Sequence, residues 1–480
     1  MEKLYNFING KFVAPNSNQY LEIFEPATGQ TYAQVADSNS ADIENAYESA
    51  QNAFGNWSSL SVKERADYLN KIAEGLESRL DEFAEYESRD TGKPISLAKS
   101  VDIPRAVSNF RFFAEYGQEF NFESELNNDQ SHNKIIRSAL GVIGCISPWN
   151  LPLYLFSWKI APALIAGNTV VAKPSEITPF TAFKLGEICQ DAGLPPGVLN
   201  IIHGQGSIAG DALVNHSKIK AISFTGGTTT GKLIAKKTAS SFKKLSLEMG
   251  GKNPSIIFSD CDFDKMMKTV VRSSFSNQGQ ICLCSSRILV EESIYEKFKT
   301  NFIQRVSDLR MGDPSEIETQ FGALSSKGHF DNVIDYIEIA KQEGGKILVG
   351  GNAKKLNGRC GNGWFIEPTI IEGLNNSCRT NQEEIFGPLV TLQSFKSEKD
   401  AIQLANETEY GLSATIWTED NEKANRVSAL IDAGVIWVNC WLVRDLRTPF
   451  GGMKQSGLGR EGGDEALRFF TEPKNICTLA

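Results

Sequence analysis

The 480-residue sequence contains only four histidines, and none of them lies close to another histidine or to the closest cysteine pair. Zinc sites need several cysteine and histidine ligands at short spacings. Cys282 and Cys284 form the one C-x-C pair and lack such partners, so a metal site is disfavoured. A cysteine–histidine peptidase is disfavoured as well, because no histidine stands in a context that resembles a catalytic base.

The sequence also lacks a basic block, a long hydrophobic run and a paired cysteine framework. A net charge of −9 without clustered cations argues against nucleic-acid binding. Residues 142–172 are the most apolar stretch, but prolines and a lysine interrupt them, so we expect buried core rather than a membrane span. The N-terminus has no signal-peptide core, and the nine scattered cysteines are typical of reduced thiols. We therefore expect a cytoplasmic protein that binds a small molecule.

Hydrophobic periodicity predicts the fold class. Residues 41–116 carry apolar side chains at helical spacing, whereas residues 141–250 alternate short apolar runs with helical segments. That alternation is typical of a parallel, doubly wound sheet. A second series of apolar runs and helical segments begins after Gly251. A chain of 480 residues is also longer than a single hydrophobic core usually accommodates. We predict an α/β protein with two lobes that meet near residues 248–251.

A glycine-rich segment, FTGGTTTGKL, follows a predicted strand and opens a predicted helix. Gly226 to Lys232 spells G-x-x-x-x-G-K, but Leu233 replaces the Ser or Thr that would bind Mg²⁺ in a P-loop, so an NTPase is disfavoured. The segment is either a helix N-terminus that binds a dinucleotide phosphate or a tight turn without a ligand.

A carboxylate follows another predicted strand, in the segment VVAKPSE. Lys173 and Glu176 would lie at the carboxyl edge of the sheet, where a carboxylate can accept both hydroxyls of an adenosine ribose. It would repel a 2′-phosphate, so NAD is favoured over NADP. A solvated lysine and glutamate are the alternative interpretation.

Three segments carry groups that could form a covalent catalytic site. LEMGGKNP places Glu248 at a strand end, ISPWNLP holds Asn150 between two stiffening prolines, and FSNQGQICLCSSR contains Cys282. A thiol, a carboxylate and an amide can act as nucleophile, base and oxyanion donor. Taken alone, the cysteine pair is as well explained by two buried thiols.

Seven motifs in order make the sequence resemble the aldehyde dehydrogenase superfamily over nearly its full length: ISPWNLP, KPSE, FTGG, LEMGGKNP, NQGQIC, EEIFGP and PFGGMKQSGLGRE. The resemblance implies an aldehyde dehydrogenase-like fold in three parts. These are a Rossmann-like NAD-binding domain (1–116 and 140–249), an α/β catalytic domain (250–448) and an oligomerisation segment (117–139 and 465–480). It also implies a homodimer or a homotetramer.

The resemblance further implies roles for individual residues. Cys282 is expected to be the nucleophile, with Asn150 and the backbone N–H of Cys282 as oxyanion donors. Glu248 is expected to activate water, since members that pass the acyl group to coenzyme A lack a carboxylate at this place. The expected NAD-binding residues are Ile146, Ser147, Trp149, Lys173, Ser175, Glu176, Phe224, Gly226, Gly227, Glu384 and Phe386. Gly227 departs from the serine of many members, which removes a side-chain contact to phosphate.

The segments DIPR…NFRFFA around Arg105 and NCWLVRDL around Arg444, together with the run ISPWNLPLYLFSWKIAPA, resemble the 2-aminomuconic and 2-hydroxymuconic semialdehyde dehydrogenases more than the betaine-aldehyde or fatty-aldehyde branches. Those enzymes act on a dienoate with a carboxylate at its far end. The resemblance therefore implies that Arg105 and Arg444, together with Asn150, bind the substrate, and that the arginines clamp its carboxylate. It implies NAD-dependent oxidation to a dicarboxylic acid, in the catabolism of aromatic compounds such as the kynurenine pathway. Another aldehyde, such as betaine, aliphatic or retinal aldehyde, is the alternative, and a non-enzymatic relative would be expected to lose Cys282 or Glu248.

Overall fold

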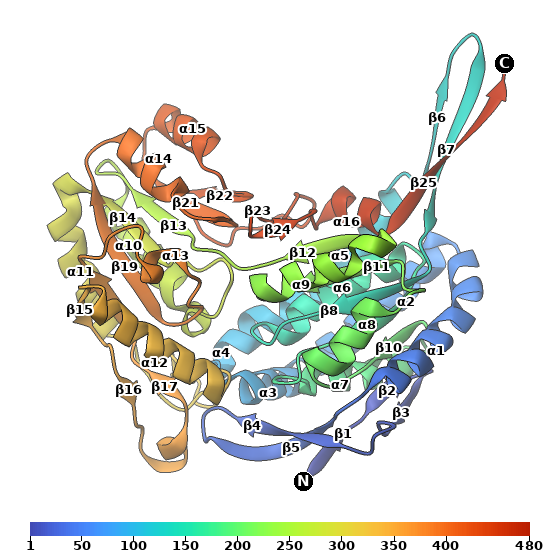
Figure 1. The fold of residues 1–480 in the computed structure, drawn as a ribbon, viewed down its shortest axis with the longest axis horizontal. Helices are drawn as coiled ribbons and strands as arrows, with labels where there is room; N and C mark the ends of the chain where they lie inside the picture. Colours follow the sequence, from blue (N-terminus) through green and yellow to red (C-terminus); the bar gives the residue numbers. More distant parts are fainter.

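An eight-stranded sheet forms the centre of the first lobe in the computed structural model, which describes residues 1–480 (Figure 1). Its strands lie in the order β24 (Gly457–Leu458), β12 (Lys244–Glu248), β11 (Ala221–Thr225), β8 (Val142–Ile146), β9 (Thr169–Lys173), β10 (Leu199–Ile201), β2 (Asn6–Ile8) and β3 (Lys11–Val13). The strands from β12 to β10 are parallel. Chain order reverses between β8 and β11, and ligands bind beyond the carboxyl ends of parallel strands at such a point.

Helices cover both faces of this sheet, because successive residues of a strand point to opposite faces. Val142 and Val171 pack with one group of helices, whereas Ile143 and Val170 pack with the other. The first group is α1 (Ser40–Ser59), α8 (Asp211–Asn215) and α9 (Thr228–Thr238). The second is α2 (Val62–Ser78), α3 (Leu80–Thr91), α5 (Ile103–Glu119), α6 (Pro152–Ile165) and α7 (Phe180–Asp191).

The predictions for two stretches of this lobe are confirmed. Residues 41–116 form α1, α2, α3, the short α4 (Ile95–Leu97), a π-helical turn and most of α5. Residues 142–172 are β8, α6 and most of β9, and every residue of α6 is buried. Local capping explains where the first helices start, since Asn39 begins α1 and Ser61 begins α2 with reciprocal capping boxes.

A seven-stranded sheet forms the second lobe, as the second α/β series predicts. Six strands are parallel and β15 at one edge is antiparallel. The order is β15 (Lys346–Val349), β18 (Thr369–Glu372), β19 (Leu389–Phe395), β14 (Arg287–Glu291), β13 (Pro254–Ile257), β21 (Ser413–Trp417) and β22 (Val435–Val438). The helices of this lobe are α10 (Phe263–Phe275), α11 (Tyr295–Ser307), α12 (Lys327–Gln342), α13 (Arg379–Gln382), α14 (Glu398–Asn406) and α15 (Asn421–Leu430).

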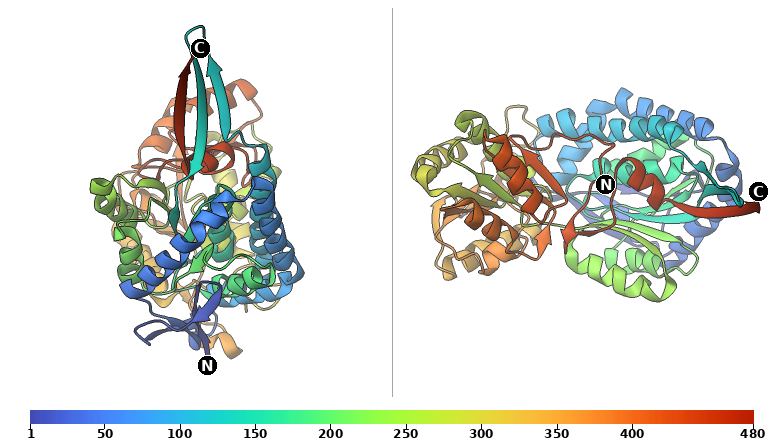
Figure 2. Two further views of the ribbon diagram at one scale, coloured as in Figure 1. Left: turned by 90° about the vertical axis from the view of Figure 1, so that its right-hand side faces the viewer. Right: turned by 90° about the horizontal axis from the view of Figure 1, so that it is seen from above.

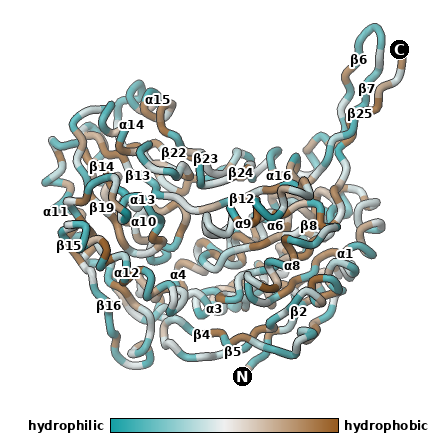
Figure 3. The backbone as a smooth tube through the Cα atoms, viewed as in Figure 1, coloured by the Kyte–Doolittle hydropathy of each residue, from teal (hydrophilic) through white to brown (hydrophobic).

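A three-stranded strand arm projects from the first lobe (Figures 1 and 2). It consists of β6 (Glu123–Asn127), β7 (Ser131–Ala139) and β25 (Thr471–Leu479), so the C-terminus pairs with a hairpin more than 300 residues earlier in the chain, and α16 (Gly463–Phe469) leads into it. The turn joining β6 and β7 is hydrophilic, whereas hydrophobic residues gather along the strands of the lobes (Figure 3).

The remaining strands form small sheets. They are β1 (Glu2–Leu4), β5 (Gln30–Ala36) and β4 (Tyr20–Glu25), the pair β16 (Ala353–Lys354) and β17 (Phe365–Ile366), and the pair β20 (Tyr410–Gly411) and β23 (Met453–Lys454). No helix combines the length and apolar character needed to cross a bilayer.

Candidate active site

A cavity of about 230 Å³ lies between the two lobes and contains all three expected catalytic residues. Asn150 and Glu248 enter it from the first lobe, and Cys282 enters it from the second. Five of the expected NAD-binding residues line it as well, namely Trp149, Gly226, Gly227, Glu384 and Phe386. Among the named groups, the fold therefore gathers residues up to 237 positions apart in the chain, from Trp149 to Phe386.

Strand register explains why the first-lobe residues meet. In the parallel sheet, Lys173 on β9 pairs with Ile146 on β8, Ile146 with Phe224 on β11, and Thr225 with Glu248 on β12. The four strands thus end at one edge, and the loops that follow them open at the point where chain order reverses.

A second cavity of about 420 Å³ continues from the first along this edge. The two share Pro148, Trp149, Thr225, Gly226 and Gly227. Its lining includes the other expected NAD-binding residues, namely Ile146, Ser147, Lys173, Ser175, Glu176 and Phe224. Gly227 is the N-cap of α9, so unpaired backbone N–H groups of that helix face the cavity, as a phosphate site requires.

Glu176 is ionised and held in place. Burial raises the pKa of its carboxyl, but the Lys173 ammonium at 3.1 Å and a hydrogen bond from the Gly206 N–H outweigh burial, so the net pKa is lowered. A fixed carboxylate at the end of β9 suits ribose hydroxyls. These residues fit a dinucleotide that carries no 2′-phosphate.

Residues 276–286, here called the nucleophile loop because they carry Cys282, connect α10 to β14. Hydrogen bonds to the backbone carbonyls hold this loop in place. Asn253 donates from its side chain to the carbonyls of Cys282 (2.7 Å) and Cys284 (2.9 Å). Gly279 has φ +73°, and a Cβ there would lie 2.2 Å from the Gly387 carbonyl oxygen. Only glycine therefore lets the nucleophile loop pass so close to the segment that carries Phe386.

The Asn150 side chain keeps one amide hydrogen available. Its Nδ2 donates one hydrogen to the Gln280 carbonyl at 2.9 Å, and a side-chain amide has two. Since Asn150 and Cys282 line the same cavity, the second hydrogen can serve an oxyanion that forms on a substrate attached to Cys282.

The acidic groups in the cavity are poised for proton transfer. Burial, and then the nearby Glu461, raise the pKa of the Glu248 carboxyl well above its usual value, and neither of its oxygens has a hydrogen-bond partner. Burial likewise raises the pKa of Glu384 to about 7 and raises that of the Cys282 thiol. A carboxyl with a raised pKa beside a thiol is typical of an acid–base site.

Glu384 lies against the hinge between the lobes. It accepts a hydrogen bond from the Gly251 N–H at 3.1 Å, and a Cβ at Gly250 would lie 1.8 Å from its carboxylate. Gly250 and Gly251 thus leave room for the Glu384 carboxyl beside the 230 Å³ cavity.

The two expected substrate arginines converge on one side chain, Tyr154. Arg444 Nη1 donates to the Tyr154 hydroxyl at 2.9 Å, and Arg105 Cζ lies 5.8 Å from the centre of the Tyr154 ring. Arg444 also lies near the catalytic groups, since its charge lowers the pKa values of Cys282 and Glu248 against the effect of burial. Neither arginine is among the residues that line the 230 Å³ cavity.

Sequence reasoning missed three residues of the site. His329 lines the cavity, stacks near Trp149 and donates from Nε2 to the Phe386 carbonyl at 2.8 Å; burial lowers its pKa to about 4, so it is neutral. Tyr154 and Asn253 are the others. Tyr154 stands four residues after Asn150, in the first turn of α6, and this spacing is visible in the sequence.

The fold and the site together define a class of protein: an α/β enzyme with a dinucleotide-type cavity at the edge of a parallel sheet and a cysteine in the cavity between its two lobes. The chain belongs to the aldehyde dehydrogenase family, whose sequence profile matches residues 12–476. This confirms the family that the seven motifs indicate, and it makes the protein an enzyme that oxidises an aldehyde.

Three relatives illustrate the similarity. The 2-aminomuconic semialdehyde dehydrogenase of Danio rerio is 49% identical, with 98% of this chain and 97% of the relative covered. The 2-hydroxymuconic semialdehyde dehydrogenase of Pseudomonas sp. (strain CF600) is 44% identical, with 99% of each covered. The NAD⁺ complex of an aldehyde dehydrogenase from Bacillus cereus superimposes with a TM-score of 0.97 at 35% identity, over 100% of this chain and 97% of that one.

Proposed function

We propose that this enzyme oxidises a carboxylate-bearing semialdehyde, 2-aminomuconic or 2-hydroxymuconic 6-semialdehyde, to the dicarboxylic acid, with NAD as the cofactor. The observation that carries the proposal is the convergence of Arg105 and Arg444 on Tyr154, which lies in the first turn of α6, four residues after Asn150. Two relatives that act on muconic semialdehydes support it, as does the NAD⁺ bound by the Bacillus cereus structure.

The chain's own residues carry out the covalent steps. The Cys282 thiol gives its proton to water, and the thiolate sulfur attacks the aldehyde carbon to form a thiohemiacetal, whose oxyanion accepts hydrogen bonds from the Asn150 amide and the Cys282 N–H. NAD, when bound, supplies the hydride acceptor that makes oxidation to a thioester possible. Glu248 then removes a proton from the water that hydrolyses the thioester, and the acid leaves as the thiol is restored.

The cofactor would be held along the edge of the eight-stranded sheet. Glu176 and Lys173 would bind the adenosine ribose, and the N-terminus of α9 at Gly226 and Gly227 would bind the pyrophosphate. Glu384 and Phe386 would bind the nicotinamide ribose and ring. Ile146, Ser147, Trp149, Ser175 and Phe224 would complete the walls.

The arginine clamp would select the substrate. Guanidinium groups form bidentate, charge-assisted hydrogen bonds with a carboxylate, and the Tyr154 hydroxyl holds one of them in place. A substrate bound by its far carboxylate presents its aldehyde to Cys282 in one orientation.

Kinetics of clamp variants test the proposal. We expect Arg105→Ala and Arg444→Ala to raise KM for a muconic semialdehyde by on the order of tenfold or more, since a charge-assisted hydrogen bond contributes about 1.5–3 kcal/mol. Tyr154→Phe should have a smaller effect in the same direction. An aliphatic aldehyde of similar length is the control, because it lacks the carboxylate. Unchanged KM and kcat for the semialdehyde in both arginine variants would refute the clamp.

We also propose the division into parts that the resemblance implies: residues 1–116 and 140–249 for NAD, 250–448 for catalysis, and 117–139 with 465–480 for assembly into a homodimer or homotetramer. The separate sheets of the two lobes and the exposed strand arm support this division. Location in the cytoplasm stays a prediction, supported by nine cysteines of which none forms a disulfide.

A further inference from the structure

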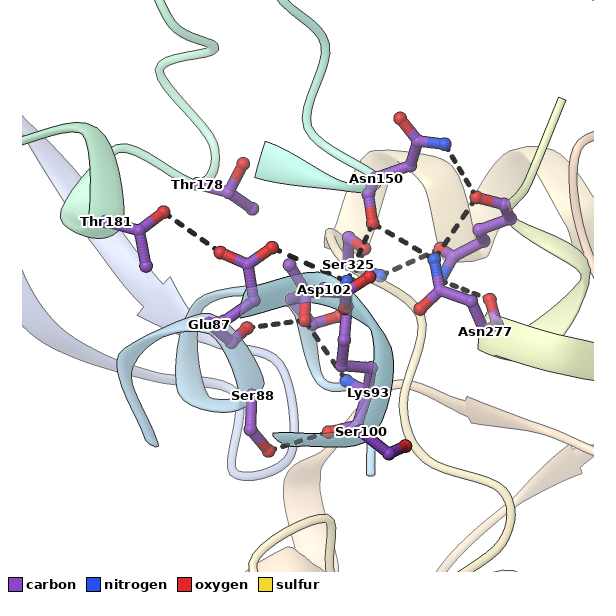
Figure 4. Close-up of polar contacts among 12 residues, drawn as sticks. Glu87, Ser88, Lys93, Ser100, Asp102, Asn150, Thr178, Thr181, Asn277 and Ser325 are labelled. Atoms are coloured by element: carbon purple, nitrogen blue, oxygen red, sulfur yellow. Dashed lines mark hydrogen bonds and ion pairs between the residues drawn. The ribbon is translucent and has the colours of Figure 1, made fainter. Parts of the chain in front are cut away.

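A buried lysine, Lys93, contacts the backbone of Asn150, the proposed oxyanion donor. Lys93 follows the C-terminal end of α3, and its side chain is 0% exposed to solvent. Its Nζ donates to the Asp102 carboxylate and to the backbone carbonyl of Asn150, the latter at 3.1 Å, and lies 3.7 Å from Glu87 (Figure 4). No step of the reaction uses this ammonium, so its position needs another explanation.

Asn150 belongs to a closed set of hydrogen bonds, here called the amide ring, that joins it to the nucleophile loop. Asn277 Nδ2 donates to the carbonyls of Asn150 (3.0 Å) and Gln280 (3.2 Å), and Asn150 Nδ2 donates to the same Gln280 carbonyl (2.9 Å). Gln280 stands two residues before Cys282. The amide ring therefore sets the nucleophile loop and the oxyanion donor relative to each other.

Lys93 completes the hydrogen bonding of this ring. A carbonyl oxygen has two lone pairs, and the Asn150 carbonyl uses one for Asn277 and the other for Lys93. With both occupied, the peptide plane after Asn150 cannot turn. Charge-assisted hydrogen bonds are roughly twice as strong as neutral ones, so Lys93 makes the stronger of the two.

Three groups surround the Lys93 ammonium, namely the carboxyls of Asp102 and Glu87 and the carbonyl of Asn150. Asp102 comes from the π-helical turn that precedes α5, and Glu87, on α3, accepts a hydrogen bond from Thr181 at 2.9 Å. Burial raises the pKa of both carboxyls, and the Lys93 ammonium opposes that rise in each case. The two residues before Lys93 also contact the second lobe, since the Thr91 carbonyl accepts from Ser325 and the Gly92 carbonyl accepts from Gln278.

We infer that Lys93 is a positioning residue that fixes the Asn150 peptide, and through the amide ring aims the Asn150 amide at the oxyanion. The inference rests on the proposed function, because it takes Asn150 as an oxyanion donor. Lys93 itself touches neither the substrate nor the cofactor.

A double-mutant cycle on the single-turnover rate of NADH formation tests this inference. Lys93→Met preserves the length of the side chain but leaves two buried carboxyls without their cation, so Lys93→Met/Asp102→Asn serves as the charge-compensated variant. We expect either to slow the single turnover by on the order of a hundredfold, the usual effect of misplacing a reacting group, with NAD affinity unchanged. Arg65→Met is the control, because Arg65 is another buried cation that donates to backbone carbonyls, at Ile165 and Leu60, and it should leave the rate unchanged.

The second arm of the cycle is Asn150→Ala. If Lys93 acts through the Asn150 amide, adding the lysine substitution to Asn150→Ala should cause almost no further loss. Additive losses would overturn the positioning role while leaving Asn150 as a donor. An Asn150→Ala enzyme with an unchanged rate would instead refute the oxyanion assignment in the proposed function. Failure of both lysine variants to fold would also overturn the inference, because Lys93 would then be required for the fold rather than for aiming the amide.

Discussion

Cys282 and Cys284 differ in what surrounds their sulfur atoms. Cys282 lines the cavity between the lobes, whereas Cys284 is 7% exposed, lies in an apolar cluster and points its sulfur at the Ser276 carbonyl, 3.7 Å away. Burial raises the pKa of both thiols, so access to the cavity between the lobes, rather than ionisation, separates Cys282 from Cys284.

Substituting each cysteine tests this difference. Cys282→Ser should abolish NAD reduction, because a serine hydroxyl is a far weaker nucleophile in the same place. Cys284→Ser should keep most of the activity, with a modest loss of thermal stability from placing a hydroxyl in an apolar cluster. NADH formation and the unfolding temperature measure the two effects. Loss of activity in a folded Cys284→Ser protein would contradict the assignment.

The raised pKa of Glu248 predicts a pH dependence. Only the ionised carboxylate can accept a proton from water, so thioester hydrolysis should accelerate as pH rises through that pKa. In Glu248→Gln, the burst of NADH should remain, while the steady-state rate falls by about 10²- to 10⁴-fold and loses this pH dependence. Burst and steady-state rates measured across pH separate the two steps. A steady-state rate equal to that of the parent enzyme would exclude Glu248 as the base.

At the scale of single residues, the side chains expected to react could be predicted from the sequence, whereas the side chains that hold them in place could not. Cys282, Glu248 and Asn150 stand in recognisable motifs, so each could be proposed from the sequence. His329 could not, because a histidine in a helix carries no distinctive pattern, and Asn253 stands in the LEMGGKNP motif but nothing there marks its side chain as a support for the cysteine loop. Their roles arise from contacts with Phe386 and with the cysteine loop, which only the folded chain brings near.

At the scale of elements, the junction between β11 and α9 shows how a departure from the family pattern can be judged. Gly227 caps α9 and lines both cavities, and a Cβ there would meet nothing within 4 Å. A side chain fits, so glycine at this place is not required by packing.

Gly227→Ser should therefore fold normally and bind NAD more tightly. One added hydrogen bond contributes about 1 kcal/mol, which corresponds to about fivefold in Kd. Titration of NAD with the purified enzyme measures it. Gly250→Ser is the contrasting variant, since a Cβ at Gly250 would strike the Glu384 carboxylate and should weaken NAD binding or the fold. An unchanged Kd in Gly227→Ser would mean that the added hydroxyl does not reach the phosphate.

At the scale of the whole molecule, the strand arm exposes apolar side chains to solvent. Leu126 is 64% exposed and Leu479 is 88% exposed, and pairing with β7 places both on the same face of the three strands. Exposed strand edges with apolar residues are typical interaction surfaces.

Leu126→Lys/Leu479→Lys should shift the protein toward the monomer, because the added charges cannot be buried in an interface without partners. Light scattering coupled to size exclusion measures the mass. Ile317→Lys is the control: Ile317 is 61% exposed but lies in the second lobe, between α11 and α12, and its substitution should leave the mass unchanged. An unaltered mass for the double variant would show that the arm does not hold the assembly together.

The sequence by itself determined the reacting groups, the alternation of strands and helices, and the family, because these depend on residue type and local spacing. Only the tertiary structure decided which groups meet. Arg105 and Arg444 are 339 positions apart and come together on Tyr154, and Lys93 reaches the Asn150 carbonyl from the loop that follows α3. Such contacts depend on how whole sheets and helices pack, and no local pattern in the chain records them.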